Sequence, residues 1–183
     1  MKKNPLVFID VETTGFDPGQ HEIIEIGGVL VKQEFSPGQG MVFSELGEFE
    51  YKIKPEKIET AEPQALQVNG YNEVEWMFAP ELKQVMTEVA NKTAGATLVA
   101  HNLCFDQAFI SAAFSRSGVE SRMHYAKLDT ISIAYAKLLN DQSVEKFSLR
   151  ALADHFGIEN EKAHTALADA RVTFEVFKKL TAI

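Results

Sequence analysis

The feature that most constrains the fold is a short apolar run near the N-terminus, Leu6-Val7-Phe8-Ile9, which leads directly into Asp10-Val11-Glu12. Alternate side chains of a β-strand point to opposite faces, so a run that is apolar at every position is buried on both faces. We therefore predict a strand over residues 6–11 in the interior of a sheet. Asp10 and Glu12 share one face of this strand, at the carboxyl end where ligands often bind.

The rest of the chain alternates between strand and helix patterns. Further strands are predicted over residues 23–32, 41–54, 97–100 and 127–130, and helices over residues 63–68, 80–91, 105–117, 131–139, 147–156 and 164–180. Gly27-Gly28 inside the second strand predicts a bulge or a close backbone approach. Three meander strands followed by strand and helix alternation predict an α/β fold with one mixed sheet covered by helices.

Composition sets broad limits on the protein. Its 183 residues suit a single domain over residues 1–183, and no run of about 18 apolar residues predicts a membrane span. We expect a cytoplasmic protein in which Cys104, the single cysteine, is a small packed residue. The net charge of −8 disfavours broad contact with nucleic acid, although a chain that grips only a strand end needs few phosphate contacts.

Two more acids lie where a helix is expected to face the core. Asp169 is followed on its stripe by Val172, Thr173, Val176, Phe177 and Leu180, and Asp106 by Phe109, Ile110 and Ala113. A buried carboxylate needs a partner. For Asp169 the alternative is an ion pair with Arg150, for Asp106 an ordinary first-turn acid, and for the Asp10–Glu12 pair a turn that faces water.

Four carboxylates gathered at one place repel one another by several kcal/mol, about 4 kcal/mol for two unit charges at ~4 Å and an effective dielectric of ~20. Hard cations such as Mg²⁺ or Mn²⁺ make such a cluster tolerable, and a pair of them suits phosphoryl hydrolysis. His164, five residues before Asp169, is a candidate general base, because a histidine titrates near neutral pH. The other histidines are expected to serve surface or packing roles.

These residues resemble the motifs of the DEDD-type 3′–5′ exonucleases of the histidine subclass, which include proofreading exonucleases and ribonuclease T. The first motif is similar to residues 7–15 followed by residues 23–27, the second to residues 99–106, and the third to His164 with Asp169; Asp129-Thr130 matches a common intermediate feature. The resemblance spans nearly the whole chain. It implies a ribonuclease H-like fold with a five-stranded mixed sheet flanked by helices.

The resemblance also implies two Mg²⁺ or Mn²⁺ ions held by Asp10, Glu12, Asp106 and Asp169, with Asp10 bridging both ions. His164 would be the general base, and nucleoside 5′-monophosphates would be the products. The residues expected to contact the substrate are Thr13, Thr14, Gly15, Asn102 and Phe105.

The implied partner is a single-stranded 3′ end, with DNA favoured over RNA and with a polymerase or another replication or repair protein as a possible recruiter. Residues 64–70 have some likeness to ribonuclease T, so RNA 3′-end trimming is the alternative. A non-catalytic nucleic-acid-binding module and a small-molecule phosphodiesterase are further alternatives. Because the chain stops at Ile183, we expect no C-terminal tail of the kind that attaches a bacterial proofreading subunit to its polymerase. The oligomeric state stays open.

Overall fold

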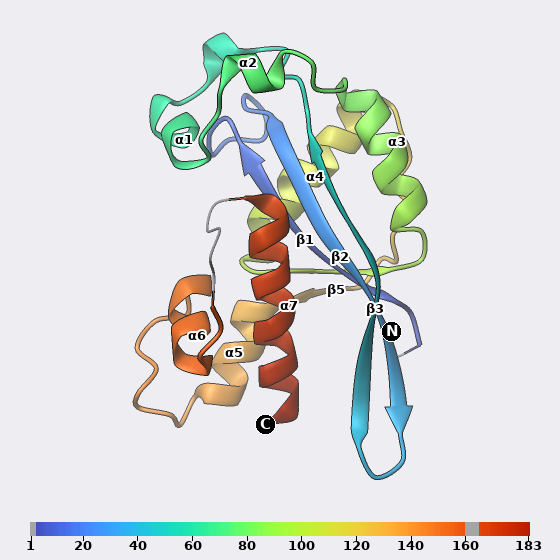
Figure 1. The fold of residues 1–183 in the computed structure, drawn as a ribbon, viewed down its shortest axis with the longest axis vertical. Coiled ribbons are helices and arrows are strands. Elements are labelled where there is room, and N and C mark those ends of the chain that lie inside the picture. Colours follow the sequence, from blue (N-terminus) through green and yellow to red (C-terminus); the bar gives the residue numbers. More distant parts are fainter. Residues whose placement is uncertain (1–2, 160–164) are drawn as a thin grey trace.

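Five strands form one mixed sheet in the computed structural model, which describes residues 3–159 and 165–183 (Figure 1). The strand order is β3-β2-β1-β4-β5. The strands are β1 (Leu6–Thr13), β2 (Ile23–Ser36), β3 (Gly40–Lys52), β4 (Thr97–Ala100) and β5 (Lys127–Asp129). The pairs β1–β2 and β2–β3 are antiparallel, whereas β1–β4 and β4–β5 are parallel. The predicted α/β fold with a mixed sheet is confirmed.

Helices precede, follow or connect these strands. They are a 3₁₀ turn at Ile58–Thr60 and α1 (Pro63–Val68), α2 (Glu73–Trp76), α3 (Leu82–Lys92), α4 (Leu103–Ser117), α5 (Thr130–Leu138), α6 (Leu149–Phe156) and α7 (Ala166–Ala182). The sequence pattern missed the 3₁₀ turn and α2, which are too short to show a helical period. It also ended β2 at Lys32, whereas the strand continues to Ser36 because ladder pairs with β3 extend the hairpin.

The central strand β1 is sealed on both faces, as predicted. Val7, Ile9 and Val11 pack with residues of α3 and α4, including Phe109. On the opposite face, the Phe8 ring lies 4.9 Å from the Phe174 ring of α7. Figure 1 shows α7 running along the middle and lower part of the sheet. In the same view α3 and α4 lie beside the upper part of the strands. Asp10 and Glu12 continue the face of Leu6 and Phe8, so their side chains meet α7.

Gly27 lies where the backbones of β2 and α7 come very close together. A Cβ atom built on Gly27 would be 2.2 Å from the backbone nitrogen of Leu167, so only glycine fits without a shift of the backbone. The predicted close approach is confirmed here. The irregularity in the β2–β3 pairing lies instead between Leu30 and Val31.

Two other expectations concern single residues and membrane association. Cys104 is exposed, so the expectation of a packed thiol was wrong; Asp106 and Phe109 occupy the inward face of α4. Among the helices of the described residues, none has the length and apolar character needed to cross a membrane.

Candidate metal centre

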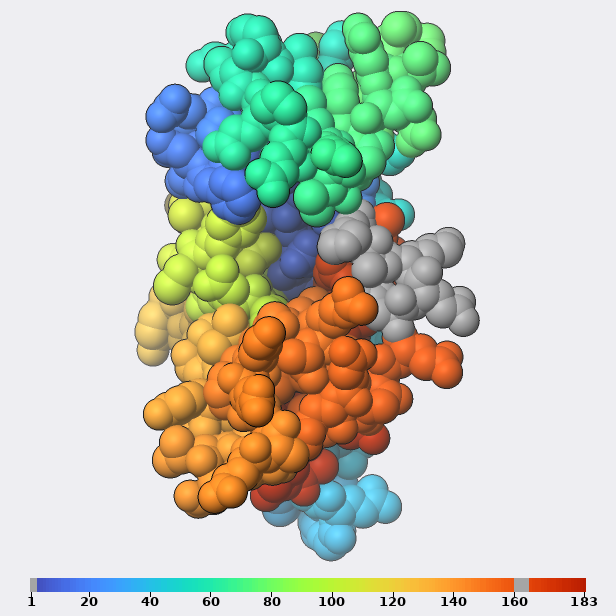
Figure 2. All heavy atoms as spheres, turned by 90° about the vertical axis from the view of Figure 1, so that its left-hand side faces the viewer, coloured from blue at the N-terminus to red at the C-terminus, as the bar shows by residue number. Residues whose placement is uncertain are grey.

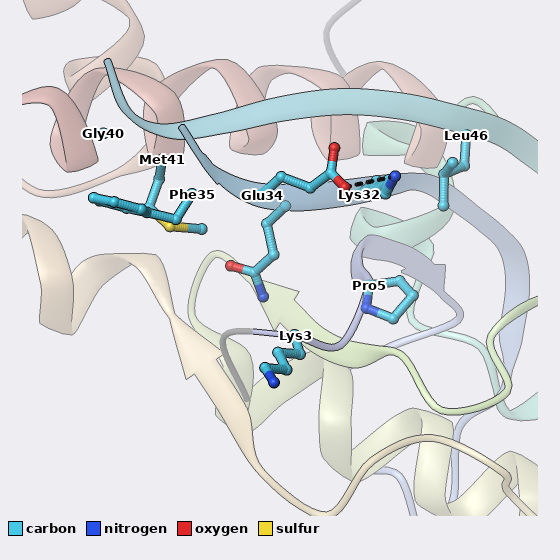
Figure 3. Close-up of a pocket in the computed structure, with 9 residues that line it drawn as sticks. Lys3, Pro5, Lys32, Glu34, Phe35, Gly40, Met41 and Leu46 are labelled. Carbon is cyan, nitrogen blue, oxygen red and sulfur yellow. Dashed lines mark ion pairs between the residues drawn. The ribbon is translucent and has the colours of Figure 1, made fainter. Parts of the chain in front are cut away.

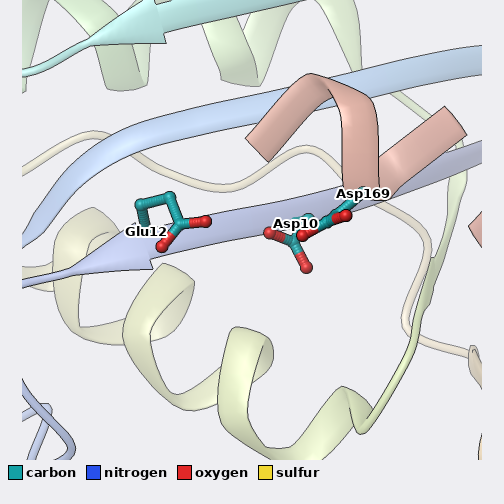
Figure 4. A group of neighbouring side chains, drawn as sticks. All are labelled: Asp10, Glu12 and Asp169. Carbon is teal, nitrogen blue, oxygen red and sulfur yellow. The ribbon is translucent and has the colours of Figure 1, made fainter. Parts of the chain in front are cut away.

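Three carboxylates from two elements meet at the end of β1. Asp10, Glu12 and Asp169 each offer an oxygen atom, and these atoms all lie within 4.8 Å of one another (Figure 4). The strand period places Asp10 and Glu12 on the face that meets α7, and Asp169 lies in the first turn of α7. Thr165 caps this helix, since its side chain accepts a hydrogen bond from the Ala168 amide. Arg150, the alternative partner of Asp169, is exposed on α6.

Asp106 adds a fourth acid from the other side of β1. Its side chain is 2% exposed in the first turn of α4, and its Oδ1 accepts a hydrogen bond of 3.2 Å from the Val11 amide. Asp129 steadies the start of the same helix by accepting a hydrogen bond from the Leu103 amide. Asp106 therefore combines a first-turn position with burial beside the acidic strand.

Burial and mutual repulsion raise the pKa values of these acids. For Asp10, burial raises the pKa well above its ordinary value, and the charges of Asp106, Asp169 and Glu12 add to the rise. For Glu12, burial and then the charge of Asp169 raise the pKa to about 8. For Asp106, burial raises the pKa to about 7, although the hydrogen bond from the Val11 amide opposes the rise.

This electrostatic arrangement fits a divalent cation. A carboxylate with a raised pKa holds a proton because its environment disfavours an uncompensated negative charge, and a cation can take the place of that proton. Carboxylate oxygens without sulfur ligands suit Mg²⁺ or Mn²⁺. We conclude that Asp10, Glu12 and Asp169 form an acidic cluster capable of holding a metal ion.

Glu25 is a further acid beside this cluster. The sequence patterns did not single out Glu25 as a site residue. It is 6% exposed on β2, directly opposite Glu12 in the β1–β2 ladder. Its Oε1 accepts a hydrogen bond of 2.9 Å from the amide of Ala166, the first residue of α7. Burial raises the pKa of the Glu25 carboxyl, while the bond from Ala166 lowers it. The available signal was a charged residue within the apolar run of Ile23–Val29.

The residues expected to contact substrate lie at the end of β1, in the loop that follows it, and at the start of α4. Thr13 donates its hydroxyl hydrogen to the Gly15 carbonyl at 2.7 Å, and the Thr14 hydroxyl accepts from the Glu22 amide at 2.9 Å. Gly15 packs against the His21 ring, where a Cβ atom would lie 2.5 Å from the ring. These contacts hold the β1–β2 loop in a defined shape next to the carboxylates.

Aromatic side chains are also present at this loop. Phe16 is 71% exposed, and its ring centroid lies 6.4 Å from that of Phe105 in an edge-on arrangement. Phe105 was predicted from the sequence as a substrate contact, whereas Phe16 was not, because an apolar residue in a loop has no periodic pattern. Asn102 is exposed at the start of α4, with a left-handed backbone (φ 63°).

Part of β1 is visible from outside the molecule (Figure 2). Figure 2 shows this strand at the floor of a depression, with the α1 region above it, α4 beside it and the α5–α6 region below. His164, the predicted base, lies outside the described residues.

Another hollow of about 970 Å³ lies at the far end of β2 (Figure 3). It is bordered by Lys3, Pro5, Phe35, Met41 and Leu46, and by an ion pair of 2.7 Å between Lys32 and Glu34. It contains no group of three potential metal ligands among the described residues. This hollow is thus chemically distinct from the acidic centre.

The fold and the acidic cluster define a ribonuclease H-like protein with a site suited to divalent cations. The chain matches the RNase_T family model, described as Exonuclease, over residues 7–177. It therefore belongs to the exonuclease family, and the predicted membership of the DEDD-type 3′–5′ exonucleases is confirmed. Its assignment as an enzyme of this class follows from the family.

Individual relatives agree with this assignment. The chain is 30% identical to the DNA polymerase III subunit epsilon of Escherichia coli, over 96% of this chain and 70% of that protein. It is 29% identical to the PolC-type DNA polymerase III of Caldanaerobacter subterraneus, but spans only 11% of that protein. In fold it is similar to an E. coli exonuclease I–single-stranded DNA complex (TM-score 0.81, 20% identity), covering 98% of this chain and 41% of that one.

Proposed function

We propose that residues 1–183 form one 3′–5′ exonuclease domain that hydrolyses the terminal phosphodiester of single-stranded nucleic acid and releases nucleoside 5′-monophosphates. The observation that carries the proposal is the meeting of Asp10, Glu12 and Asp169 within 4.8 Å at the end of β1. This strand is visible at the floor of a depression on the surface (Figure 2). DNA is the favoured substrate, because the relatives include DNA polymerase III subunits and an exonuclease I–single-stranded DNA complex.

The proposed cofactors are two Mg²⁺ or Mn²⁺ ions. Asp10, Glu12 and Asp169 would hold one ion, and Asp10 with Asp106 would hold the other. When bound, the ions supply Lewis-acid activation and stabilise the negative charge that develops at the phosphate. The raised pKa values of Asp10, Glu12 and Asp106 support this assignment, since these groups are poorly accommodated as bare anions.

The remaining steps fall to the chain's own side chains. His164 would accept a proton from the attacking water, as its position five residues before Asp169 suggests. Thr13, Thr14 and Gly15 would lie along the terminal nucleotide, and Asn102 would contact the strand beside it. Phe105 would stack with a base, and the exposed Phe16 ring next to it extends this apolar surface.

Recruitment and location are part of the same proposal. A polymerase or another replication or repair protein is the proposed partner, because the chain is related to subunits of DNA polymerase III. The cytoplasm is the proposed location. RNA 3′-end trimming is the alternative function, supported by the likeness of residues 64–70 to ribonuclease T.

The test is digestion of 5′-labelled single strands of matched DNA and RNA sequence with purified protein and Mg²⁺. We expect stepwise shortening from the 3′ end, faster on DNA, with nucleoside 5′-monophosphates as products. Asp10→Ala should abolish it, whereas Asp141→Ala, which removes an exposed acid in the loop after α5, should have no effect.

Three results would contradict the proposal in different ways. Faster digestion of RNA would favour the trimming alternative. Binding of the strands without cleavage would favour a non-catalytic module. Hydrolysis of bis(p-nitrophenyl) phosphate without any preference for strand ends would favour a small-molecule phosphodiesterase.

A further inference from the structure

We propose that Glu25 and Gly27 of β2 form a seat for the start of α7, and that this seat positions Asp169 against Asp10 and Glu12. Glu25 would thus be a positioning residue that acts on the metal centre through the helix. This inference rests on the proposed function, because it concerns the same metal centre.

The hydrogen bond from Ala166 to Glu25 fixes where the helix begins. The first amides of a helix lack partners within the helix, and a carboxylate at this end satisfies one of them and interacts favourably with the helix dipole. Glu25 Oε1 accepts the Ala166 amide at 2.9 Å, in a buried setting. Asp169 follows in the same first turn, so the bond to Ala166 also sets the place of the Asp169 carboxylate.

Gly27 fixes how close the helix comes. It lies two residues after Glu25 on the same face of β2, and its missing side chain leaves room for the backbone of Ala166 and Leu167. A Cβ atom there would lie 2.4 Å from the carbonyl carbon of Ala166 and 2.2 Å from the nitrogen of Leu167. Glu25 and Gly27 therefore set the position and the distance of the helix start independently.

The location of Glu25 is electrostatically unfavourable for the fold itself. Glu25 stands directly opposite Glu12 in the antiparallel ladder, and like charges in such pairs are destabilising. Its charge also adds to the rise in the pKa of both Glu12 and Asp10. The carboxylate of Glu25 accepts the hydrogen bond from the amide at the start of α7, and this bond explains an acid at this position. A favourable interaction with a neighbouring charge does not explain it.

Two conservative variants separate the effect of the length of the Glu25 side chain from the effect of its charge. Glu25→Asp keeps the charge but shortens the side chain by one methylene, so it loses the Ala166 amide. Glu25→Gln keeps the reach and an acceptor oxygen but removes the charge. Glu22→Asp is the matched control, because the Glu22 carboxylate also accepts backbone amides, those of Glu56 and Lys57, away from α7.

The first measurement is Mn²⁺ binding, followed by electron paramagnetic resonance of the free ion. Partners that orient metal ligands typically contribute 10- to 100-fold to metal affinity, so we expect Glu25→Asp to bind Mn²⁺ about 10-fold more weakly. Glu22→Asp should bind like the wild type, and Glu25→Gln, which loses only the charge, should be weakened much less than Glu25→Asp. Equal affinity in Glu25→Asp and the wild type, or equal weakening in both Glu25 variants, would overturn the inference.

A second measurement does not depend on the metal. Hydrogen exchange of the amides of residues 166–169 in EDTA should be faster in Glu25→Asp than in Glu25→Gln and the wild type. If the wild type fails to bind Mn²⁺, the proposed function is refuted, while this exchange still decides whether Glu25 fixes the helix. Unchanged exchange in Glu25→Asp would refute the seat.

The glycine pair offers an independent check. Gly27→Ala places a methyl group against the α7 backbone, whereas Gly28→Ala places one 2.5 Å from the Phe49 ring on the opposite face of β2. We expect only Gly27→Ala to lower Mn²⁺ affinity in the folded protein, by about 10-fold. Equal affinities in the two glycine variants would contradict the role of Gly27.

Discussion

Replacing Glu12 with glutamine should stabilise the metal-free protein at neutral pH while it weakens the metal centre. The reason is the raised pKa of Glu12, about 8 against an ordinary value of 4.5. An acid with a raised pKa in the folded state binds protons more tightly than in the unfolded state. The favourable contribution of the Glu12 side chain to the free energy of unfolding is therefore complete below pH 4.5. It is lost progressively as the pH rises from 4.5 through about 8.

The pKa shift sets the size of the effect. Each pH unit between the two pKa values lowers the free energy of unfolding by about 1.4 kcal/mol. At pH 7 the loss attributable to Glu12 would be about 3 kcal/mol. Because water screens this partly buried side chain, we expect Glu12→Gln to be about 1–3 kcal/mol more stable than the wild type in EDTA at pH 7. The difference should shrink toward zero at pH 4.5.

Urea unfolding followed by circular dichroism measures these free energies. Glu120→Gln, which changes an exposed acid after α4, is the control and should differ from the wild type by less than about 0.5 kcal/mol. Adding Mn²⁺ at about 100 times its Kd should stabilise the wild type by about 2.7 kcal/mol and the variant by much less. A Glu12→Gln protein that is less stable than the wild type in EDTA, or a difference independent of pH, would refute the reasoning.

Three further predictions concern packing, substrate contact and the start of α7. Phe8→Ala should lower the free energy of unfolding by about 3–5 kcal/mol in urea titrations, because its side chain is fully buried, whereas Phe35→Ala at the exposed hairpin should cost less than about 0.5 kcal/mol. Phe16→Ala should raise KM for single strands about 10-fold through lost stacking, with an unchanged unfolding midpoint; an unchanged KM would exclude this contact. Thr165→Ala should cost about 1 kcal/mol by removing the helix cap, and an unaltered urea midpoint would contradict the capping role.

The fold was readable from the sequence where a pattern repeats. The strand at Thr97–Ala100 and the helix at Pro63–Val68 have the predicted bounds, since a short apolar run and an N-terminal proline mark them. The end of β2 was not readable, because residues 33–36 are held by backbone pairing with β3. Backbone pairing leaves no hydrophobic period in the sequence.

The acidic centre was readable for a different reason. Asp10, Glu12 and Asp169 each interrupt an apolar stripe, so their burial follows from the period of the strand or helix that carries them. Phe16 interrupts nothing, because it belongs to a loop. Glu25 interrupts an apolar run as well, yet its contact with Ala166 joins residues 141 positions apart and depends on how α7 lies over β2.

The acidic residues of the centre and the apolar residues around them have opposite effects on the stability of the fold. Asp10, Glu12 and Asp106 have raised pKa values, so at neutral pH the bare centre opposes folding as long as no cation is present. The apolar packing of Phe8 against Phe174 supplies stability on the same face of β1 and the same helix. A helix held by packing alone would relax away from three repelling carboxylates. The Ala166–Glu25 bond opposes that relaxation at the one turn where Asp169 has to stay close, so the centre is preorganised for a cation before one binds.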